Sequence, residues 1–82
     1  MIHMVLHDGG VFKLESWGNG LSYELLHKPS NMSTFVQGDD ADRFAEEREL
    51  VERHMPDKTD EQVLMWLWDQ CDYGSAAQEV TP

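Results

Sequence analysis

The chain has 82 residues, 40% of them hydrophobic, and its 16 acidic side chains outnumber the six lysines and arginines to give a formal net charge of −10. This length allows one small core, and three tryptophans supply apolar surface for a folded domain instead of a disordered segment. The excess of acid disfavours direct contact with nucleic acid or anionic membranes, because both require clustered lysine and arginine.

Turn signals divide residues 1–37 into short runs in which apolar and polar side chains alternate, the pattern of a β-meander. Asp8-Gly9-Gly10 is a hairpin signal, and Gly18-Asn19-Gly20 supplies residues that tolerate positive φ at a tight reversal. We expect an antiparallel sheet of three or four strands. The runs cover residues 2–7, 11–17, 21–28 and 32–37.

After the last run the spacing of apolar residues becomes helical. In a helix from about residue 40 to 55, Phe44 and Val51 fall on one side, which should cover the sheet. Either Asp39 or Asp40 is suited to cap the N-terminus of this helix, where a carboxylate also complements the helix dipole.

A second helix begins at Thr59-Asp60-Glu61-Gln62, which has the spacing of a capping box. We expect this helix to run from about residue 60 to 73 and to end at Gly74. The last residues carry no periodic pattern. The sequence therefore predicts one α+β domain over residues 1–82, with the sheet in 1–37, two helices packed on one face in 39–74 and a flexible tail in 75–82.

Most of the negative charge belongs to the second half of the chain. Residues 39–82 contain thirteen acids and four bases, a net charge of −9. On the first helix the carboxylates fall three and four residues apart, opposite the apolar side, and form an acidic ridge. Such a row can imitate phosphates in a basic groove of a partner, or it can keep a small protein soluble. The predicted partner-binding carboxylates are Asp39, Asp40, Asp42, Glu46, Glu49 and Glu52.

The second helix has apolar side chains around most of its circumference, which is typical of a helix buried on more than one side. At about 100° per residue, Trp66 and Trp68 point in nearly opposite directions. One explanation places this helix between the sheet and the first helix. The other leaves one aromatic edge for a partner or a second subunit, and both tryptophans are included among the predicted partner-binding residues.

The sequence contains no pattern that indicates a reaction. His3 and His7 would lie about 13 Å apart on a strand, too far to share a metal ion. A small hydrolase would require His54 close to Cys71, but Cys71 follows the apolar side of the second helix, where thiols are commonly inert. We expect no catalytic residues, no metal, no cofactor and no enzymatic activity.

Cys71 is the only cysteine, so no intrachain disulfide can form, which fits a reducing compartment. The first residues lack the basic region of a signal peptide. No apolar run approaches the roughly 20 residues that cross a bilayer. These features predict a cytoplasmic protein with no membrane contact.

The acid-rich segment Asp39-Asp40-Ala41-Asp42-Arg43-Phe44-Ala45-Glu46-Glu47-Arg48-Glu49 continues through Glu61 on a small chain without catalytic residues. In this profile the chain resembles the small acidic inhibitors encoded by phages and other mobile elements, particularly anti-CRISPR and antirestriction proteins. The resemblance is one of type over the full length and rests on no diagnostic motif. It implies a stoichiometric inhibitor that binds where guide or target strands would lie, in the cytoplasm of a host cell if the protein is phage-encoded.

We accordingly expect an acidic inhibitor that binds the basic surface of a nucleic-acid-binding complex as a nucleic-acid mimic. The alternative is a homodimeric accessory or structural protein in which the aromatic edge of the second helix pairs with a second copy. In that case the acidity would serve solubility alone. Salt-sensitive binding to a basic protein favours the first hypothesis, and a stable dimer at low micromolar concentration favours the second.

Overall fold

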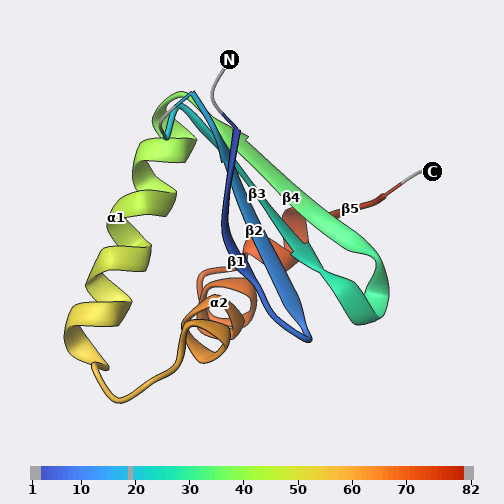
Figure 1. Cartoon of the computed structure of the whole chain (residues 1–82). Helices are drawn as coiled ribbons and strands as arrows, with labels where there is room; N and C mark the ends of the chain where they lie inside the picture. Colours follow the sequence, from blue (N-terminus) through green and yellow to red (C-terminus); the bar gives the residue numbers. More distant parts are fainter. Residues whose placement is uncertain (1–2, 19, 81–82) are drawn as a thin grey trace.

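The computed structural model describes residues 3–18 and 20–80, in which two helices cover one face of a five-stranded antiparallel sheet (Figure 1). The strand order is β1-β2-β3-β4-β5, and β5 comes from the chain that follows both helices. The elements are β1 (His3–Asp8), β2 (Phe12–Trp17), β3 (Ser22–His27), β4 (Met32–Gln37), α1 (Asp39–His54), α2 (Asp60–Asp69) and β5 (Gln78–Glu79), with the 3-10 helices η1 (Lys28–Ser30) and η2 (Tyr73–Ala76).

The α+β class is confirmed, but the described chain has five strands where the sequence predicts three or four. The additional strand, β5, lies in the segment expected to be a flexible tail. It pairs only with Met32 and Ser33 of β4. Asn31 holds the end of β5, because its carbonyl accepts from the Val80 N–H at 2.9 Å and its side-chain amide donates to the Val80 carbonyl at 3.1 Å. A two-residue strand is too short to show alternation, so the local sequence gives no signal for it.

Alternation along the strands determines which face the helices cover. Phe12 and Leu14 of β2 and Leu25 of β3 point toward the helices and are almost completely buried. The register places Leu14 beside Leu25, so the two strands present one continuous apolar surface. The intervening residues of each strand point to the opposite face, which no helix of the described chain covers.

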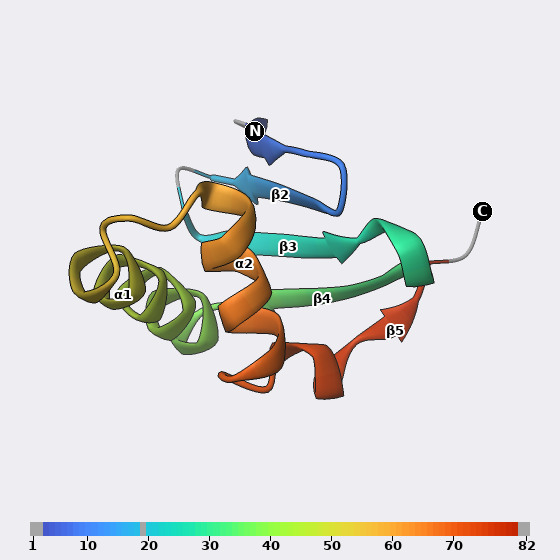
Figure 2. The ribbon, with the colours of Figure 1, turned by 90° about the horizontal axis from the view of Figure 1, so that it is seen from below.

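The helices fill the core from the other side. α2 crosses the covered face of the sheet (Figure 2) and buries Val63, Leu64 and Leu67. α1 buries Phe44 and Val51, so the predicted apolar side of this helix is confirmed. None of the helices in the described chain combines the length and apolar character needed to span a membrane.

The sequence predicts side-chain caps at both helix starts, and the structure confirms one of them. At α2 the Thr59 side chain accepts from the Gln62 N–H and the Gln62 side chain accepts from the Thr59 N–H, a complete capping box. At α1 the N-cap residue is Gly38, which has a φ of 62° and no side chain. The predicted cap by Asp39 or Asp40 is wrong, because β4 turns into α1 through a positive φ that favours glycine, and both aspartates already lie inside the helix.

The end of α2 also differs from the prediction. The helix stops at Asp69, before the expected end near residue 73, and Asp72 then adopts a left-handed φ of 63°. Gly74 does not terminate α2 but lies in η2. A Cβ atom there would come within 2.7 Å of the Trp68 indole nitrogen, so glycine is required for close packing against this ring.

Glu61 connects α2 to the β1–β2 hairpin. Its Oε1 accepts from the Val11 N–H at 2.6 Å and the Phe12 N–H at 3.3 Å, and its Oε2 lies 2.5 Å from the His7 ring. Burial favours the neutral form of this carboxyl, but the Val11 N–H, the His7 ring and the Phe12 N–H together outweigh it and lower the pKa of Glu61 below its ordinary value of 4.5. Gly9 belongs to the same contact, because a Cβ atom there would lie 2.5 Å from the carboxylate.

We predict that Glu61→Ala lowers the free energy of unfolding by about 1–3 kcal/mol, because two partly buried backbone N–H groups lose their acceptor. Asp60→Ala is the matched control, since it removes a carboxylate from the same first turn of α2 and should cost less than about 1 kcal/mol. Urea denaturation of both variants measures the difference. Equal losses would contradict a specific role for Glu61.

The contribution of Glu61 also depends on pH. Because folding lowers its pKa, the stabilisation is complete above the ordinary glutamate value and is lost as the pH falls through the lower folded value. The stability difference between the wild-type chain and Glu61→Ala should therefore shrink as the solution is acidified.

Candidate functional site

α1 lies along one flank of the molecule (Figure 1). Its exposed side carries the predicted acidic ridge. Ala41, Phe44 and Val51 point inward and are buried. This orientation leaves the polar positions between them facing solvent, as the helical spacing predicts. All six carboxylates predicted on this helix are exposed: Asp39, Asp40, Asp42, Glu46, Glu49 and Glu52.

Ion pairs divide this ridge into two halves. Toward the C-terminus of α1, Glu49 lies 2.8 Å from Arg53 and Glu52 lies 3.5 Å from Arg48, each pair one helical turn apart. Such exposed pairs stabilise the fold very little, but each guanidinium cancels the charge beside it. Negative potential is therefore concentrated on the N-terminal half. Its carboxylates form no ion pair within the described chain: Asp39, Asp40, Asp42 and Glu46.

An exposed leucine interrupts the ridge. The Leu50 side chain is 47% exposed and lies in a shallow hollow with Glu46, Glu49 and Arg53. An apolar side chain among carboxylates offers a partner a surface from which water is easily removed. The outward side of α1 can therefore provide both electrostatic attraction and apolar contact.

The structure separates the two predicted tryptophans. Trp66 is 36% exposed on the outer side of α2. Trp68 is half-buried, because its indole stacks on the His27 ring at 5.3 Å and contacts the Phe12 ring edge-on at 5.8 Å. Trp68 therefore packs against the core, and Trp66 is the tryptophan of α2 that is available to a partner.

A groove of about 280 Å³ runs along the outer side of α2 beside Trp66. Met65, which is 40% exposed, and Val11 supply further apolar surface there. Lys58 and Asp69 lie among the polar side chains that line it. The groove is consequently an amphipathic surface of the kind found at protein interfaces.

Glu47, Tyr73 and Cys71 form a cluster between α1 and η2 that the sequence analysis does not identify. The Tyr73 hydroxyl donates to Glu47 Oε1 at 3.2 Å. Burial, followed by the Glu47 carboxylate and Asp72, raises the pKa of Cys71 to about 11. Burial and Glu47 also raise the pKa of Tyr73. The cluster therefore keeps both groups protonated, and Cys71 is a poor nucleophile.

The cysteine and histidine considered for a hydrolase have different surroundings. His54 Nδ1 bonds to the Leu50 carbonyl oxygen at 2.9 Å within α1, while the groups that act on Cys71 are Glu47 and Asp72. Within residues 3–18 and 20–80, no three histidine, cysteine or acidic side chains are grouped closely enough to hold a metal ion.

Aromatic rings also lie on the face of the sheet that is turned away from the helices. The His3 and Trp17 rings stack at 4.9 Å, and Phe35 lies 6.1 Å from Trp17. Phe35 is 54% exposed. The sequence analysis assigns no role to these residues, although the alternation that buries Phe12 and Leu14 places the intervening residues on this uncovered face.

We predict that iodoacetamide modifies Cys71 about a hundredfold more slowly in the folded protein than in urea, because raising the pKa from 9.0 to about 11 reduces the thiolate fraction by that factor. Glu47→Gln should accelerate the folded-state reaction, since it removes a charge that opposes the thiolate. Glu46→Gln, on the solvent side of the same helix, is the control. A folded thiol that reacts as fast as the unfolded one would contradict this assignment.

Comparisons with known proteins leave these surfaces to be interpreted from their geometry. No family model, curated protein or solved structure matches the chain. No residue role is therefore transferred from another protein.

Proposed function

We propose that the chain is a protein-binding inhibitor whose α1 surface occupies the basic, nucleic-acid-binding surface of a partner. One observation carries the proposal: Asp39, Asp40, Asp42 and Glu46 are exposed on consecutive turns of α1 and have no ion pair in the described chain. Exposed carboxylates that have no cationic neighbour bound to them attract an approaching cationic surface, and salt screens this attraction.

The spacing of these carboxylates suits a surface that binds phosphates. At a rise of about 1.5 Å per residue, Asp42 and Glu46 are separated by about 6 Å along the helix axis. Phosphates of one DNA strand repeat at about 3.4 Å, so this separation approaches two phosphate steps. Lysines and arginines arranged for a nucleic-acid backbone would therefore meet acidic groups at a comparable interval.

Apolar contact would complement this attraction. Charged surfaces raise the rate of encounter, whereas desolvated apolar groups extend the lifetime of a complex. Leu50 lies directly beside Glu46 and Glu49 and would provide such a contact. The expected partner has a basic surface that includes an apolar patch to contact Leu50.

The proposal predicts that Glu46→Lys weakens capture of basic proteins from a cell lysate at low salt. Its control, Asp57→Lys, changes the net charge equally at an exposed position outside α1. For a captured and purified partner, Glu46→Lys should slow association at least about threefold at low salt. The difference should vanish in about 0.5 M salt, where screening is strong.

Displacement by nucleic acid tests the inhibitory part of the proposal. If the α1 surface occupies a nucleic-acid site, then added DNA or RNA should release the captured partner and the protein should reduce the partner's nucleic-acid binding. Equal capture by Glu46→Lys and Asp57→Lys, or a partner that binds nucleic acid and this protein simultaneously, would contradict the proposal.

A homodimer is the second candidate, and the groove on α2 is the observation that favours it. Trp66 and Met65 would contribute apolar area to a symmetric interface if two copies paired along this helix. In that arrangement the carboxylates of α1 would remain in solvent and serve solubility.

Sedimentation velocity at low micromolar concentration tests this alternative. A dimer formed through the groove should dissociate on Trp66→Ala, because a buried aromatic anchor at an interface is commonly worth more than about 2 kcal/mol. Leu50→Ala removes an exposed apolar side chain from α1 and is the matched control. A monomeric wild-type chain excludes the homodimer, and a dimer insensitive to Trp66→Ala excludes this interface.

A further inference from the structure

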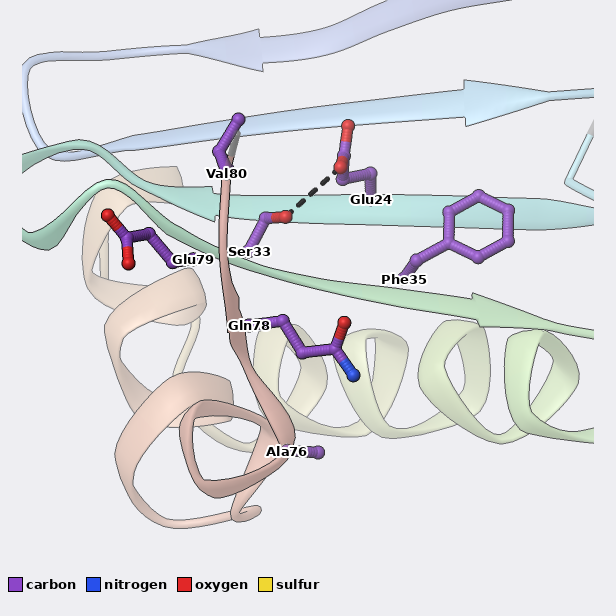
Figure 3. A pocket seen from close by; sticks show the side chains of 7 residues that line it. All are labelled: Glu24, Ser33, Phe35, Ala76, Gln78, Glu79 and Val80. Atoms are coloured by element: carbon purple, nitrogen blue, oxygen red, sulfur yellow. Dashed lines mark hydrogen bonds between the residues drawn. The ribbon is translucent and has the colours of Figure 1, made fainter. Parts of the chain in front are cut away.

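The outer edge of β4 is only partly occupied. β5 pairs with Met32 and Ser33, and the segment that leads into it comes from η2, where the Tyr73 carbonyl accepts from the Thr34 hydroxyl at 2.5 Å. Beyond Thr34, β4 continues from Phe35 to Gln37 without a neighbouring strand on that side (Figure 3). A strand edge with free backbone groups is a template for another extended segment. This stretch leads through Gly38 into the N-terminus of α1 and offers backbone groups, whereas the outward side of that helix offers carboxylates.

The direction of the free backbone groups follows from the adjacent pairing. The Asn31 carbonyl accepts from Val80, so it points toward the β5 side. Backbone groups alternate between the two neighbours of an antiparallel strand, which directs the N–H and C=O of Phe35 and Gln37 to the same side. Both residues are exposed, and within the described chain none of these four groups has a hydrogen-bond partner there.

A cavity lies on each side of this edge. The first, about 380 Å³, opens on the uncovered face, where Glu24, Ser33 and Gln78 line it (Figure 3). The second, about 310 Å³, lies on the helix side between β4, α1 and η2. Both cavities include Phe35 and Ala76, so they meet at the edge itself.

We propose that this edge binds an extended segment of a partner protein in which basic and aliphatic side chains alternate. The segment would run antiparallel to β4, in line with β5, and its backbone would bond to Phe35 and Gln37. Because successive side chains of a strand point to opposite faces, they would enter the two cavities in turn. This mode of recognition takes affinity from backbone bonds and specificity from alternate pockets.

The lining of each cavity determines which side chain it takes. On the uncovered face, the Glu24 carboxylate and the exposed Phe35 ring both attract a cation. The helix-side cavity is lined by Asp40, Glu47 and Asp72 as well as by Arg43. Arg43 offsets part of this negative charge and Glu47 accepts from the Tyr73 hydroxyl, so we assign the aliphatic side chain to this cavity, where Val36 and Tyr73 offer apolar contact. Residues directly opposite each other share a face, which places the basic residues opposite Phe35 and Gln37.

The charge near the edge also favours a partner over a second copy. Around the two cavities lie five carboxylates and one guanidinium: Glu24, Asp40, Glu47, Asp72 and Glu79, with Arg43. Two edges of this kind would repel each other if identical chains paired there. A basic segment of another protein would meet the opposite charge.

The test uses the intact protein and a capped hexapeptide of alternating arginine and valine. Binding should slow the hydrogen exchange of the Phe35 and Gln37 amides at least about tenfold, because both N–H groups gain acceptors. N-methylation of the arginines should weaken binding at least about tenfold, since their N–H groups face β4, whereas N-methylation of the valines should change it less than about twofold. General attraction of a cationic peptide by the acidic protein would not distinguish the two methylated peptides.

Two variants test whether an arginine side chain of the peptide binds beside Glu24. Glu24→Gln should weaken peptide binding about three- to tenfold, while Glu15→Gln on the same face of the sheet should have less than about twofold effect. Glu46→Lys should bind the peptide much as the wild type does, so failure of the α1 proposal and failure of this one are separable.

Three results would overturn the inference. The first is unchanged exchange at Phe35 and Gln37 when the peptide is bound. The second is an equal effect of the two N-methylated peptides. The third is a peptide-free protein that sediments as a dimer with both amides already protected, which would identify a second copy as the occupant of this edge.

Discussion

The packing of α2 across one face of the sheet is the constraint on which the rest of the structure depends. A chain of this length supports one core, and Leu64 and Leu67 fill it against Phe12, Leu14 and Leu25. Burial of this apolar surface, worth about 25 cal/mol per Å², must offset the ordering of the backbone and the mutual repulsion of a chain with a net charge of −10. Both helices are committed to this face, which leaves the opposite face and part of the β4 edge free.

The acidic side chains differ in the hydrogen bonds and ion pairs that they contribute to the fold. Glu61 is structural, because it accepts backbone N–H groups from the hairpin that α2 must cover. Glu47 is internal and holds the Tyr73 hydroxyl. Glu49 and Glu52 have arginines beside them, whereas the acids in the first turns of α1 contribute no contact to the fold. The aspartates of the first turn complement the dipole of α1, but they form no ion pair in the described chain, and the proposed charge-based function is assigned to them and to Glu46.

Local signals made much of the fold predictable from the sequence. The alternation along β2 placed Phe12 and Leu14 on one face, and Thr59 with Gln62 identified the start of α2, because each of these features depends on residues close together in the chain. Which face the helices cover was not predictable from this alternation. β5 was not predictable, since its pairing depends on β4, which lies far away in the sequence. The sequence indicates only that Gly38 ends a strand. Its role as the N-cap of α1 follows from its positive φ, which the sequence does not show.

The candidate site was predictable to a similar degree. Helical periodicity was sufficient to place the six carboxylates of α1 in solvent, and the four-residue spacing of Glu49 and Arg53 already indicates an ion pair. The choice between Trp66 and Trp68 depends on where β2 and β3 cross α2, which no local pattern specifies. The hairpin contact of Glu61 and the free edge of β4 likewise arise only from contacts between distant segments.

The two proposed surfaces adjoin each other because of the way β4 leads into α1. Gly38 is the only residue between the last residue of β4 and the first residue of the helix, and Asp40 lines the helix-side cavity at the strand edge. Asp40, one of the unpaired carboxylates of α1, therefore lines the same cavity as Phe35. A long-range field accelerates encounter without fixing a register, whereas backbone hydrogen bonds fix a register but act only at contact. Together the two features would allow α1 to attract a basic partner and β4 to align it. The association rate would then depend on salt, and the dissociation rate would depend on the backbone hydrogen bonds to β4.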